Sequence, residues 1–250
     1  MLLLKNINSS KPLHWLSTIS LVLLFSSATA AWEIVPLNEN FYSKIQQEYG
    51  EQTEKRFRTL QSLLLREDKR PLKEELIAVN DFFNQIQWRD DLSHWGKKDY
   101  WQTPLETMTS FTGDCEDIAI AKYTALRMLG VGDDRLALVY VKINQPPVYN
   151  DVAHMILAYY KNHDADPLIM DSIDRSLKAS SQREDLLSIY EFNTTTLWLT
   201  DHHLHKLSKG FPSSSLSLEN NLKQRLSKNR KHLSKLNGGK PFYPFSLETL

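Results

Sequence analysis

One helix followed directly by strands constrains the fold of this chain more than any other feature. An apolar stripe at helical spacing covers residues 115–129, begins directly after Gly113 and Asp114, and ends at Gly130, a residue type common just past a helix end. Runs typical of strands follow at residues 136–143, 154–160 and 168–171. Residues 162–167 separate the last two runs as a loop, so we expect these runs to form a hairpin. The sequence predicts an α+β fold, with this helix packed on an antiparallel sheet.

Two helical runs lie ahead of this core, within residues 40–89. Their apolar residues recur at the spacing of helices that bury one face. The residues that form the two runs are Phe57, Leu60 and Leu64, and then Leu76, Val79, Phe82, Phe83 and Ile86. Pro71 lies between the runs and is expected to open the second helix. The polar, aromatic-rich residues 90–104 that follow are predicted to be a loop.

The composition changes after Trp198, where a basic stretch covers residues 223–235. Leucines at helical spacing indicate a helix that ends before Asn237. They are Leu218, Leu222, Leu226, Leu233 and Leu236. The formal net charge of the whole chain is +0, and the basic stretch lacks the interleaved aromatic side chains of a base-stacking surface. We therefore interpret it as the solvated face of a docking helix and expect no nucleic-acid partner.

Residues 1–30 have the pattern of an export signal. A lysine-containing start is followed by an apolar run over residues 15–25 and by the small residues Ala28 and Ala30, with cleavage expected after Ala30. The apolar run is too short for a membrane span, which needs about 20 residues. We expect a mature chain in the periplasm, without a transmembrane segment.

The sequence contains a single cysteine, Cys115. An oxidising compartment favours cysteines paired in disulfides and exposes a lone thiol to oxidation, so an unpaired cysteine there needs an explanation. One explanation is a buried cysteine that acts as a small apolar residue. Cys115, however, falls in the first turn of its helix, where unpaired backbone amides and the helix dipole stabilise a thiolate. The position favours a nucleophile.

A cysteine nucleophile needs a base that takes and returns a proton, and a third group that orients the base. His154 begins one predicted strand, and the hairpin would bring Asp171 on the next strand beside it. A cysteine at a helix N-terminus that faces a histidine and an aspartate on neighbouring strands is a papain-like arrangement. Each residue alone has a structural explanation, but together they predict a triad of Cys115, His154 and Asp171.

Several segments resemble one known family, the bacterial transglutaminase-like cysteine proteinases of LapG type. Within about residues 33–198, the matching segments are 79–84 (VNDFFN), 99–106 (DYWQTPLE), 113–123 (GDCEDIAIAKY), 154–160 (HMILAYY) and 168–171 (LIMD). The resemblance implies a transglutaminase-like core, with Cys115 as nucleophile, His154 as base and Asp171 as orienting group. Family members usually have an asparagine after this aspartate, whereas Ser172 stands here, which leaves the orienting role intact.

The domain organisation that we expect follows from these features. It comprises a signal peptide at 1–30, an N-terminal helical lobe at 31–110, a catalytic core with the sheet at 111–205, and a basic C-terminal helical tail at 206–250. The resemblance does not extend into the tail beyond about Leu204.

The resemblance also implies a biological role. It implies a periplasmic protease that cuts a large cell-surface adhesin near its N-terminus and so releases a biofilm, under an inner-membrane receptor that senses cyclic-di-GMP. Two other functions stay open. One is transfer of the acyl group to an amine, which uses the same thioester intermediate. The other is a binding module without catalysis, which the presence of all three triad residues disfavours.

The acidic residues around Cys115 suggest a metal ion. Asp114, Glu116 and Asp117 crowd negative charge near the expected thiolate, and two like charges about 4 Å apart cost roughly 1 kcal/mol in water and about 4 kcal/mol at an effective dielectric of 20. These residues can simply favour the positive end of the helix, or a hard cation such as Ca²⁺ can neutralise them. The resemblance places calcium on Asp114 and Glu116. We favour Ca²⁺ there, with Asp164 and Asp166 as additional candidate ligands.

Two further groups of residues attract notice. His202, His203 and His205 match no closed zinc site, because no cysteine is spare to join them, and we interpret them as loop histidines. The tryptophans are expected to pack in the core or in a groove, with Trp101 as the one that would lie near an oxyanion.

Overall fold

The computed structural model describes residues 36–65, 70–163, 165–201, 204–207, 210–213 and 217–240. All of them belong to one unit, Trp32–Leu250. The predicted signal peptide at 1–30 lies outside the described residues. None of the helices within the described ranges is long and apolar enough to cross a membrane.

Three helices come first: α1 (Glu39–Tyr49), α2 (Glu51–Leu64) and α3 (Leu72–Phe83). The side chain of Asn38 begins α1 by accepting a hydrogen bond from the backbone N–H of Phe41 at 2.9 Å. The sequence analysis predicts two helical runs in this part, and the structure adds a break at Gly50. Its φ of 89° is readily adopted by glycine, because glycine lacks a Cβ. Pro71 precedes α3, as predicted.

The connection that follows α3 is more ordered than the predicted loop. It contains α4 (Asp91–Trp95), and α5 (Pro104–Ser110) begins at its end. The side chain of Thr103 accepts from the N–H of Glu106 at 3.2 Å, and the carboxylate of Glu106 accepts from the N–H of Thr103 at 2.7 Å, which makes a capping box. The short strand β1 (Gln87–Trp88), which precedes α4, pairs in parallel with β2 (Thr112–Gly113), and β2 leads into α6 (Cys115–Met128).

The main sheet is antiparallel, with the described strands in the order β6-β5-β4-β3-β7-β8-β9. Their bounds are β3 (Leu136–Gln145), β4 (Tyr149–Tyr159), β5 (Leu168–Met170), β6 (Lys178–Ala179), β7 (Leu186–Phe192), β8 (Thr196–Leu199) and β9 (Phe211–Pro212). The predicted hairpin is present as β4 and β5, which pair Leu157 with Met170. Asp171 therefore directly follows the last paired residue. The α+β class and the antiparallel sheet are confirmed.

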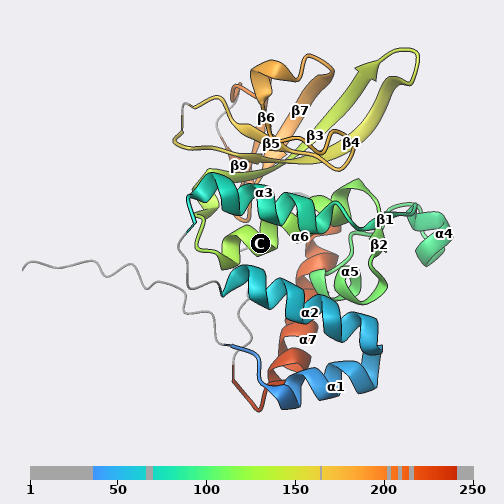
Figure 1. Cartoon of the computed structure of the whole chain (residues 1–250). Helices are drawn as coiled ribbons and strands as arrows, with labels where there is room; N and C mark the ends of the chain where they lie inside the picture. Colours follow the sequence, from blue (N-terminus) through green and yellow to red (C-terminus); the bar gives the residue numbers. More distant parts are fainter. Residues whose placement is uncertain are drawn as a thin grey trace, which may run out of the picture. The chain divides into compact units, whose positions relative to one another are not determined.

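The helices cover one face of this sheet, and α6 is the helix that contacts β3 and β4 (Figure 1). Alternate residues of β4 point to opposite faces. Met155, Leu157 and Tyr159 join the core shared with the helices, while Ile156 and Ala158 join a smaller core on the other face. The two faces of β4 are therefore both buried from His154 onward, and the face with Met155, Leu157 and Tyr159 is the one that packs on the helices.

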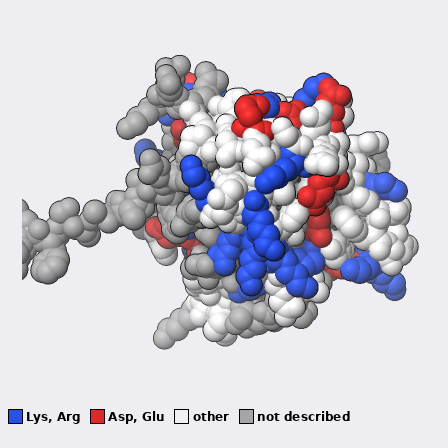
Figure 2. All heavy atoms as spheres, turned by 90° about the horizontal axis from the view of Figure 1, so that it is seen from below, with Lys and Arg blue, Asp and Glu red and all other residues white. Residues whose placement is uncertain are grey.

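The last helix, α7 (Ser217–Leu236), is the one predicted from the leucine stripe. Leu222, Leu226 and Leu233 are buried in the same core as the N-terminal helices. α7 also contacts α1 (Figure 1). Lys228 and Lys231 are exposed, as the solvated-face interpretation requires. Figure 2 shows Lys and Arg side chains gathered on one part of the surface seen from below, with acidic side chains beside them.

Candidate functional site

Cys115 is the first residue of α6, and Asp114 precedes it as the N-terminal cap residue. Gly113 allows this entry to the helix to pack closely. A Cβ at this position would lie 2.6 Å from Asp117 Oδ2 and 2.9 Å from Gln102 Nε2, so a larger residue would displace both side chains. Gly113 therefore helps to fix the position of the Cys115 thiol.

The thiol of Cys115 is half-buried and meets two groups. Its Sγ donates to Glu116 Oε2 at 3.0 Å, and the backbone N–H of Met155 on β4 is hydrogen-bonded to it. Burial raises the pKa of the thiol well above its ordinary value, and the negative charges of Glu116 and Asp114 raise it further. While these carboxylates stay uncompensated, the thiol keeps its proton.

His154 and Asp171 form a buried pair. His154 Nε2 lies 2.7 Å from Asp171 Oδ1, with side-chain exposures of only 4% and 0%, so water does not compete for this contact. Because Asp171 engages Nε2, Nδ1 is the ring nitrogen left to exchange a proton. Cys115 and His154 line the same pocket, of about 710 Å³. The structure thus brings the three predicted triad residues into one region.

Asp171 is held by three further donors. Arg183 Nη2 donates to Oδ2 at 2.8 Å, and the backbone N–H of Ile173 donates to Oδ1 at 2.9 Å. Lys122 Nζ, from α6, donates to the backbone carbonyl at 3.0 Å. Although burial opposes it, hydrogen bonding and charge from His154, Ile173 and Arg183 hold the pKa of Asp171 well below its ordinary value. The carboxylate is therefore ionised and fixed.

The sequence analysis did not identify Arg183 or Lys122 as part of the site. A lysine inside the apolar stripe of residues 115–129 is a signal that could have marked Lys122, since a buried lysine needs a partner. Arg183 lies in a connection after β6 and has no local signal. Only the packing of that connection against β5 brings Arg183 to Asp171.

Asn84, at the C-terminus of α3, lies in the wall of the same pocket. Its side chain is 5% exposed, and neither amide atom has a hydrogen-bond partner among the described residues. Buried amides are almost always hydrogen-bonded, so an unpartnered one in a reactive pocket points to a role with a ligand. An amide N–H placed here can donate to a charged oxygen in the pocket.

Five carboxylates gather beside Cys115. Ligand oxygens of Asp91, Asp114 and Asp117 lie within 4.8 Å of one another, and so do those of Asp91, Asp99 and Glu116. In the described part of the chain, no Lys or Arg forms an ion pair with any of them. Oδ1 of Asp91 and Oδ1 of Asp114 are buried without a hydrogen-bond partner. The cluster therefore lacks positive charge.

Burial raises the pKa of four of these carboxyls, including that of Asp99, and the charge of Glu116 adds to the effect. The pKa is raised to about 10 for Asp114, to about 8 for Asp117 and to about 6 for Asp91. A buried charge needs a partner of opposite sign or a metal ion. Because the donors are all oxygens, and two of them have no other partner, the residues fit a hard cation of the Ca²⁺ type.

Backbone amides of residues 100–102 orient two of these carboxylates. The N–H of Tyr100 donates to Asp91 Oδ2 at 2.5 Å, and the N–H of Gln102 donates to Asp117 Oδ1 at 2.7 Å. The side-chain amide of Gln102 also donates to Asp117 Oδ2. The connection after α3 thus contains Asp91 itself, and it also supplies the N–H groups that donate to Asp91 and Asp117.

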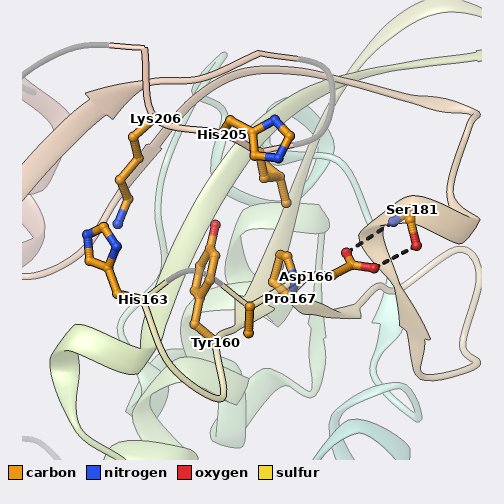
Figure 3. A pocket seen from close by; sticks show the side chains of 9 residues that line it. Tyr160, His163, Asp166, Pro167, Ser181, His205 and Lys206 are labelled. Carbon is orange, nitrogen blue, oxygen red and sulfur yellow. Dashed lines mark hydrogen bonds between the residues drawn. The ribbon is translucent and has the colours of Figure 1, made fainter.

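The predicted metal ligands divide into two groups. Asp114 and Glu116 both belong to the acidic cluster. Asp166 lies elsewhere: it accepts hydrogen bonds from the N–H and the hydroxyl of Ser181 at 3.2 and 2.6 Å, in a separate pocket of about 650 Å³ (Figure 3). Asp164 is outside the described residues.

Asp91 and Asp99 are the acidic residues that the sequence analysis missed. Both lie in the stretch predicted to be a loop, and they are separated from Cys115 in the sequence. Asp99 belongs to one of the segments that carry the family resemblance, and this is the signal that could have drawn attention to it. Nothing local distinguishes Asp91 from the neighbouring Asp90.

Two minor expectations have different outcomes. Trp101 is not among the residues that line the pocket with Cys115. It is buried, stacks on Phe192 of β7 with ring centroids 5.7 Å apart, and its indole N–H is hydrogen-bonded to Asp99, so its place near an oxyanion stays a prediction. His205 is exposed and pairs with Asp201 at 2.9 Å, as suits a loop histidine. His202 and His203 lie outside the described residues.

Comparisons with known proteins agree on one family. Residues 40–192 match the family described as bacterial transglutaminase-like cysteine proteinase BTLCP. The structure of EGTA-treated LapG from Legionella pneumophila is 35% identical and covers 76% of this chain and 99% of its own, with a TM-score of 0.64. Calcium-bound LapG from the same organism is also 35% identical, covering 74% of this chain and 97% of its own, with a TM-score of 0.62. No curated protein matches the sequence significantly.

Replacing Arg183 should destabilise the fold. Arg183→Met removes the donor to Asp171 and the partner of Asp185, and breaking a buried ion pair costs about 3–5 kcal/mol of unfolding free energy. Urea unfolding checks this, with the exposed Arg175→Met as the matched control. Equal unfolding free energies for the two variants would show that Arg183 does not hold Asp171.

Lys122 should make stability depend on pH. Burial lowers the pKa of Lys122 from 10.5 to about 7, so between these values the unfolded chain binds a proton that the folded chain has lost. The contribution of Lys122 to the free energy of unfolding therefore rises with pH across this window. Lys122→Met cannot titrate and should flatten the rise, which urea unfolding at a series of pH values measures. An unchanged pH slope in the variant would contradict the expectation.

Proposed function

This chain belongs to the bacterial transglutaminase-like cysteine proteinases and is a cysteine protease, and we propose that Cys115, His154 and Asp171 are its catalytic triad. The observation that carries the proposal is the buried His154–Asp171 pair, which leaves Nδ1 of the imidazole free in the pocket that Cys115 lines. The position of Cys115 at the start of α6 adds support, because backbone amides there favour a thiolate.

The roles of the three residues follow from their contacts. His154 Nδ1 takes the proton of Cys115, and the sulfur attacks the carbonyl carbon of a peptide bond. The C–N bond then breaks as His154 returns the proton to the leaving amine, which leaves a thioester on Cys115. Water, deprotonated by His154, hydrolyses the thioester and restores the thiol. Asp171 holds the Nε2–H and stabilises the imidazolium in between.

The tetrahedral intermediate carries a negative oxygen that needs donors. The free backbone N–H groups at the start of α6 are one source, and the unpartnered amide of Asn84 is the other. Both lie at the pocket of Cys115. This assigns Asn84 the part that the sequence analysis gave to Trp101.

We propose that the acidic cluster binds Ca²⁺. Asp114 and Glu116 would hold it together with Asp91, Asp99 and Asp117, whose oxygens gather beside Cys115. A bound Ca²⁺ supplies the positive charge that keeps these carboxylates ionised and lowers the free-energy cost of a thiolate beside them. The calcium-bound structure of LapG from Legionella pneumophila supports this proposal.

We further propose that the enzyme is a periplasmic endopeptidase whose substrate is the N-terminal region of a large cell-surface adhesin. In this proposal cleavage releases a biofilm and is controlled by an inner-membrane receptor that senses cyclic-di-GMP. The support is the family match over residues 40–192 and the similarity to LapG. Incubation of the purified chain with candidate adhesin fragments, with and without calcium, tests it.

Transfer of the acyl group to an amine is the alternative that the same thioester allows. Mass spectrometry of the products separates the two reactions, because hydrolysis yields two fragments and transfer yields a cross-linked product. If the chain were a binding module without catalysis, the mass of the substrate would stay unchanged.

Cys115→Ala should leave the fold intact and abolish cleavage. The substitution removes the nucleophile and leaves only a small void, so we expect activity to fall by roughly 10⁴-fold or more. Cleavage of an adhesin fragment measures activity, and circular dichroism checks the fold. Residual activity near that of the wild type would exclude Cys115 as the nucleophile.

His154→Ala should be as inactive as Cys115→Ala, because it removes the base that takes the thiol proton and returns it to the leaving amine. Asp171→Asn should be less severe, since the base is misoriented rather than lost. The same cleavage assay compares the three variants. A fully active His154→Ala would mean that a different residue acts as the base.

A calcium-selective chelator should inhibit the enzyme, and excess Ca²⁺ should restore it. Mg²⁺ should restore it poorly, because it demands a tighter octahedron and loses water reluctantly. Asp114→Ala and Glu116→Ala should also lose the rise in melting temperature on adding Ca²⁺, whereas the exposed Glu184→Ala should keep it. Full turnover after chelation, with no calcium-dependent melting shift, would leave these acids as helix-end residues.

A further inference from the structure

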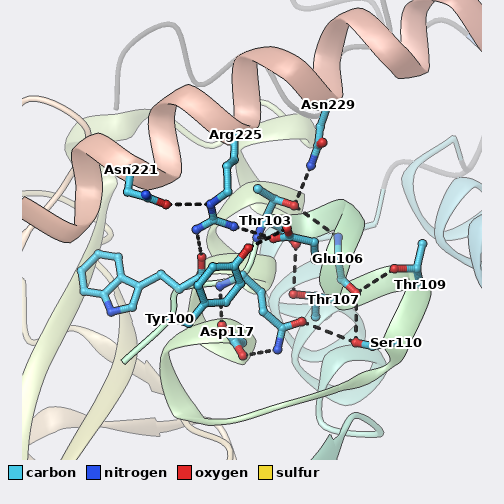
Figure 4. Close-up of polar contacts among 12 residues, drawn as sticks. Tyr100, Thr103, Glu106, Thr107, Thr109, Ser110, Asp117, Asn221, Arg225 and Asn229 are labelled. Carbon is cyan, nitrogen blue, oxygen red and sulfur yellow. Dashed lines mark hydrogen bonds and ion pairs between the residues drawn. The ribbon is translucent and has the colours of Figure 1, made fainter. Parts of the chain in front are cut away.

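α7 contacts the segment that orients two carboxylates of the acidic cluster. This helix lies beyond residues 40–192, where the family match ends. Its leucines pack in the core, while Arg225 and Asn229 point toward residues 100–106 (Figure 4). A helix that needed only apolar packing would not require these polar contacts, so they call for an explanation.

Arg225 makes the most extensive of these contacts. Nη1 donates to Glu106 Oε2 at 2.6 Å, and Nη2 donates to the backbone carbonyl of Trp101. Nε donates to Asn221 Oδ1 at 2.8 Å within α7, and the guanidinium lies 4.2 Å from the centre of the Tyr100 ring. Because the guanidinium is planar and held on several sides, it fixes the direction of each group that it contacts.

Asn229, one helical turn further along α7, adds a second contact. Its Nδ2 donates to Thr103 Oγ1 at 2.7 Å, which is the oxygen that caps α5. Tyr100 is tied to the same place, since its hydroxyl donates to Glu106 Oε1 at 2.9 Å. The outer side of residues 100–106 is thus fixed by α7.

The inner side of this segment faces the acidic cluster. The carbonyl of Trp101 and the N–H of Gln102 belong to one peptide unit, which is planar, so the two groups point in opposite directions. Arg225 holds the carbonyl end, and the N–H end donates to Asp117 Oδ1 at 2.7 Å. Turning this plane would break both hydrogen bonds together. The N–H of Tyr100, which belongs to the peptide unit between Asp99 and Tyr100, holds Asp91.

We infer that α7 positions the cation site through residues 100–103, with Arg225 and Asn229 as the positioning residues. They touch neither the cation ligands nor Cys115, and they act by fixing the peptide units whose amides orient Asp91 and Asp117. Groups that orient the ligands of a metal typically change metal affinity by about 10- to 100-fold when they are removed. This inference rests on the proposed calcium site.

Calcium affinity, measured without any substrate, tests the inference. The full chain is titrated with Ca²⁺ alone in a calorimeter, as wild type, Arg225→Met and Asn229→Ala. We expect the dissociation constant to rise by roughly 10-fold or more for Arg225→Met and to rise less for Asn229→Ala, which removes one hydrogen bond. Arg225→Lys keeps the charge but not the planar fork, so it should fall between Arg225→Met and wild type.

Lys228→Met is the matched control, because Lys228 is an exposed cation on the same helix. It should bind Ca²⁺ as the wild type does. Melting temperatures with and without Ca²⁺ separate positioning from general support. A role in stability alone lowers both temperatures equally, whereas a positioning role reduces the difference between them.

The outcomes distinguish this inference from the proposed function. Wild-type affinity in both Arg225→Met and Asn229→Ala would overturn the inference and leave the calcium site standing. A wild-type chain that binds no Ca²⁺ would overturn the site and the inference together. If Arg225→Met does not fold, the Ca²⁺ affinity of Asn229→Ala decides whether the inference stands. An inactive triad would affect neither titration, since no cleavage is measured.

Discussion

Negative charge buried beside Cys115 imposes the main constraint on this structure. The pKa values of Asp114 and Asp117 are raised by burial, and the thiol responds to the same field, because Glu116 and Asp114 raise its pKa as well. The helix dipole at the start of α6 opposes this effect, but one helix end carries only about half a positive charge. The proposed Ca²⁺ in the acidic cluster would resolve both problems at once. Metal binding and activation of the proposed nucleophile would then be coupled through electrostatics.

Asp171 joins the two halves of the proposed catalytic arrangement. Its carboxylate orients His154 and is held by Arg183, while its backbone carbonyl accepts from Lys122 of α6. The helix that carries Cys115 and the strand that precedes Asp171 are therefore linked by a direct hydrogen bond as well as by the apolar core. Since a buried lysine is costly without a partner, this contact also favours one placement of α6 on the sheet.

The part between α3 and α6 illustrates where local patterns mislead. Residues 90–104 are polar and rich in aromatic side chains, which predicts a loop, yet they supply Asp91, Asp99 and the amides that orient the acidic cluster. Trp101 has the size and position in sequence of a residue near the reaction, but the structure stacks it on Phe192. Its carbonyl accepts a hydrogen bond from Arg225, and its indole N–H is hydrogen-bonded to Asp99 of the acidic cluster.

The sequence by itself determined the α+β class, the helix that begins at Cys115, the strand that carries His154 and the strand that Asp171 directly follows. It also determined three of the acidic residues around Cys115, which are Asp114, Glu116 and Asp117. These follow from local periodicity, from glycine positions and from short motifs, which nearby residues decide. Only the tertiary structure placed Arg183 on Asp171, Asn84 in the pocket wall, Asp91 and Asp99 in the acidic cluster, and Arg225 against the carbonyl of Trp101. Those contacts join residues far apart in the chain, and they form because burial of the shared core fixes which surfaces meet.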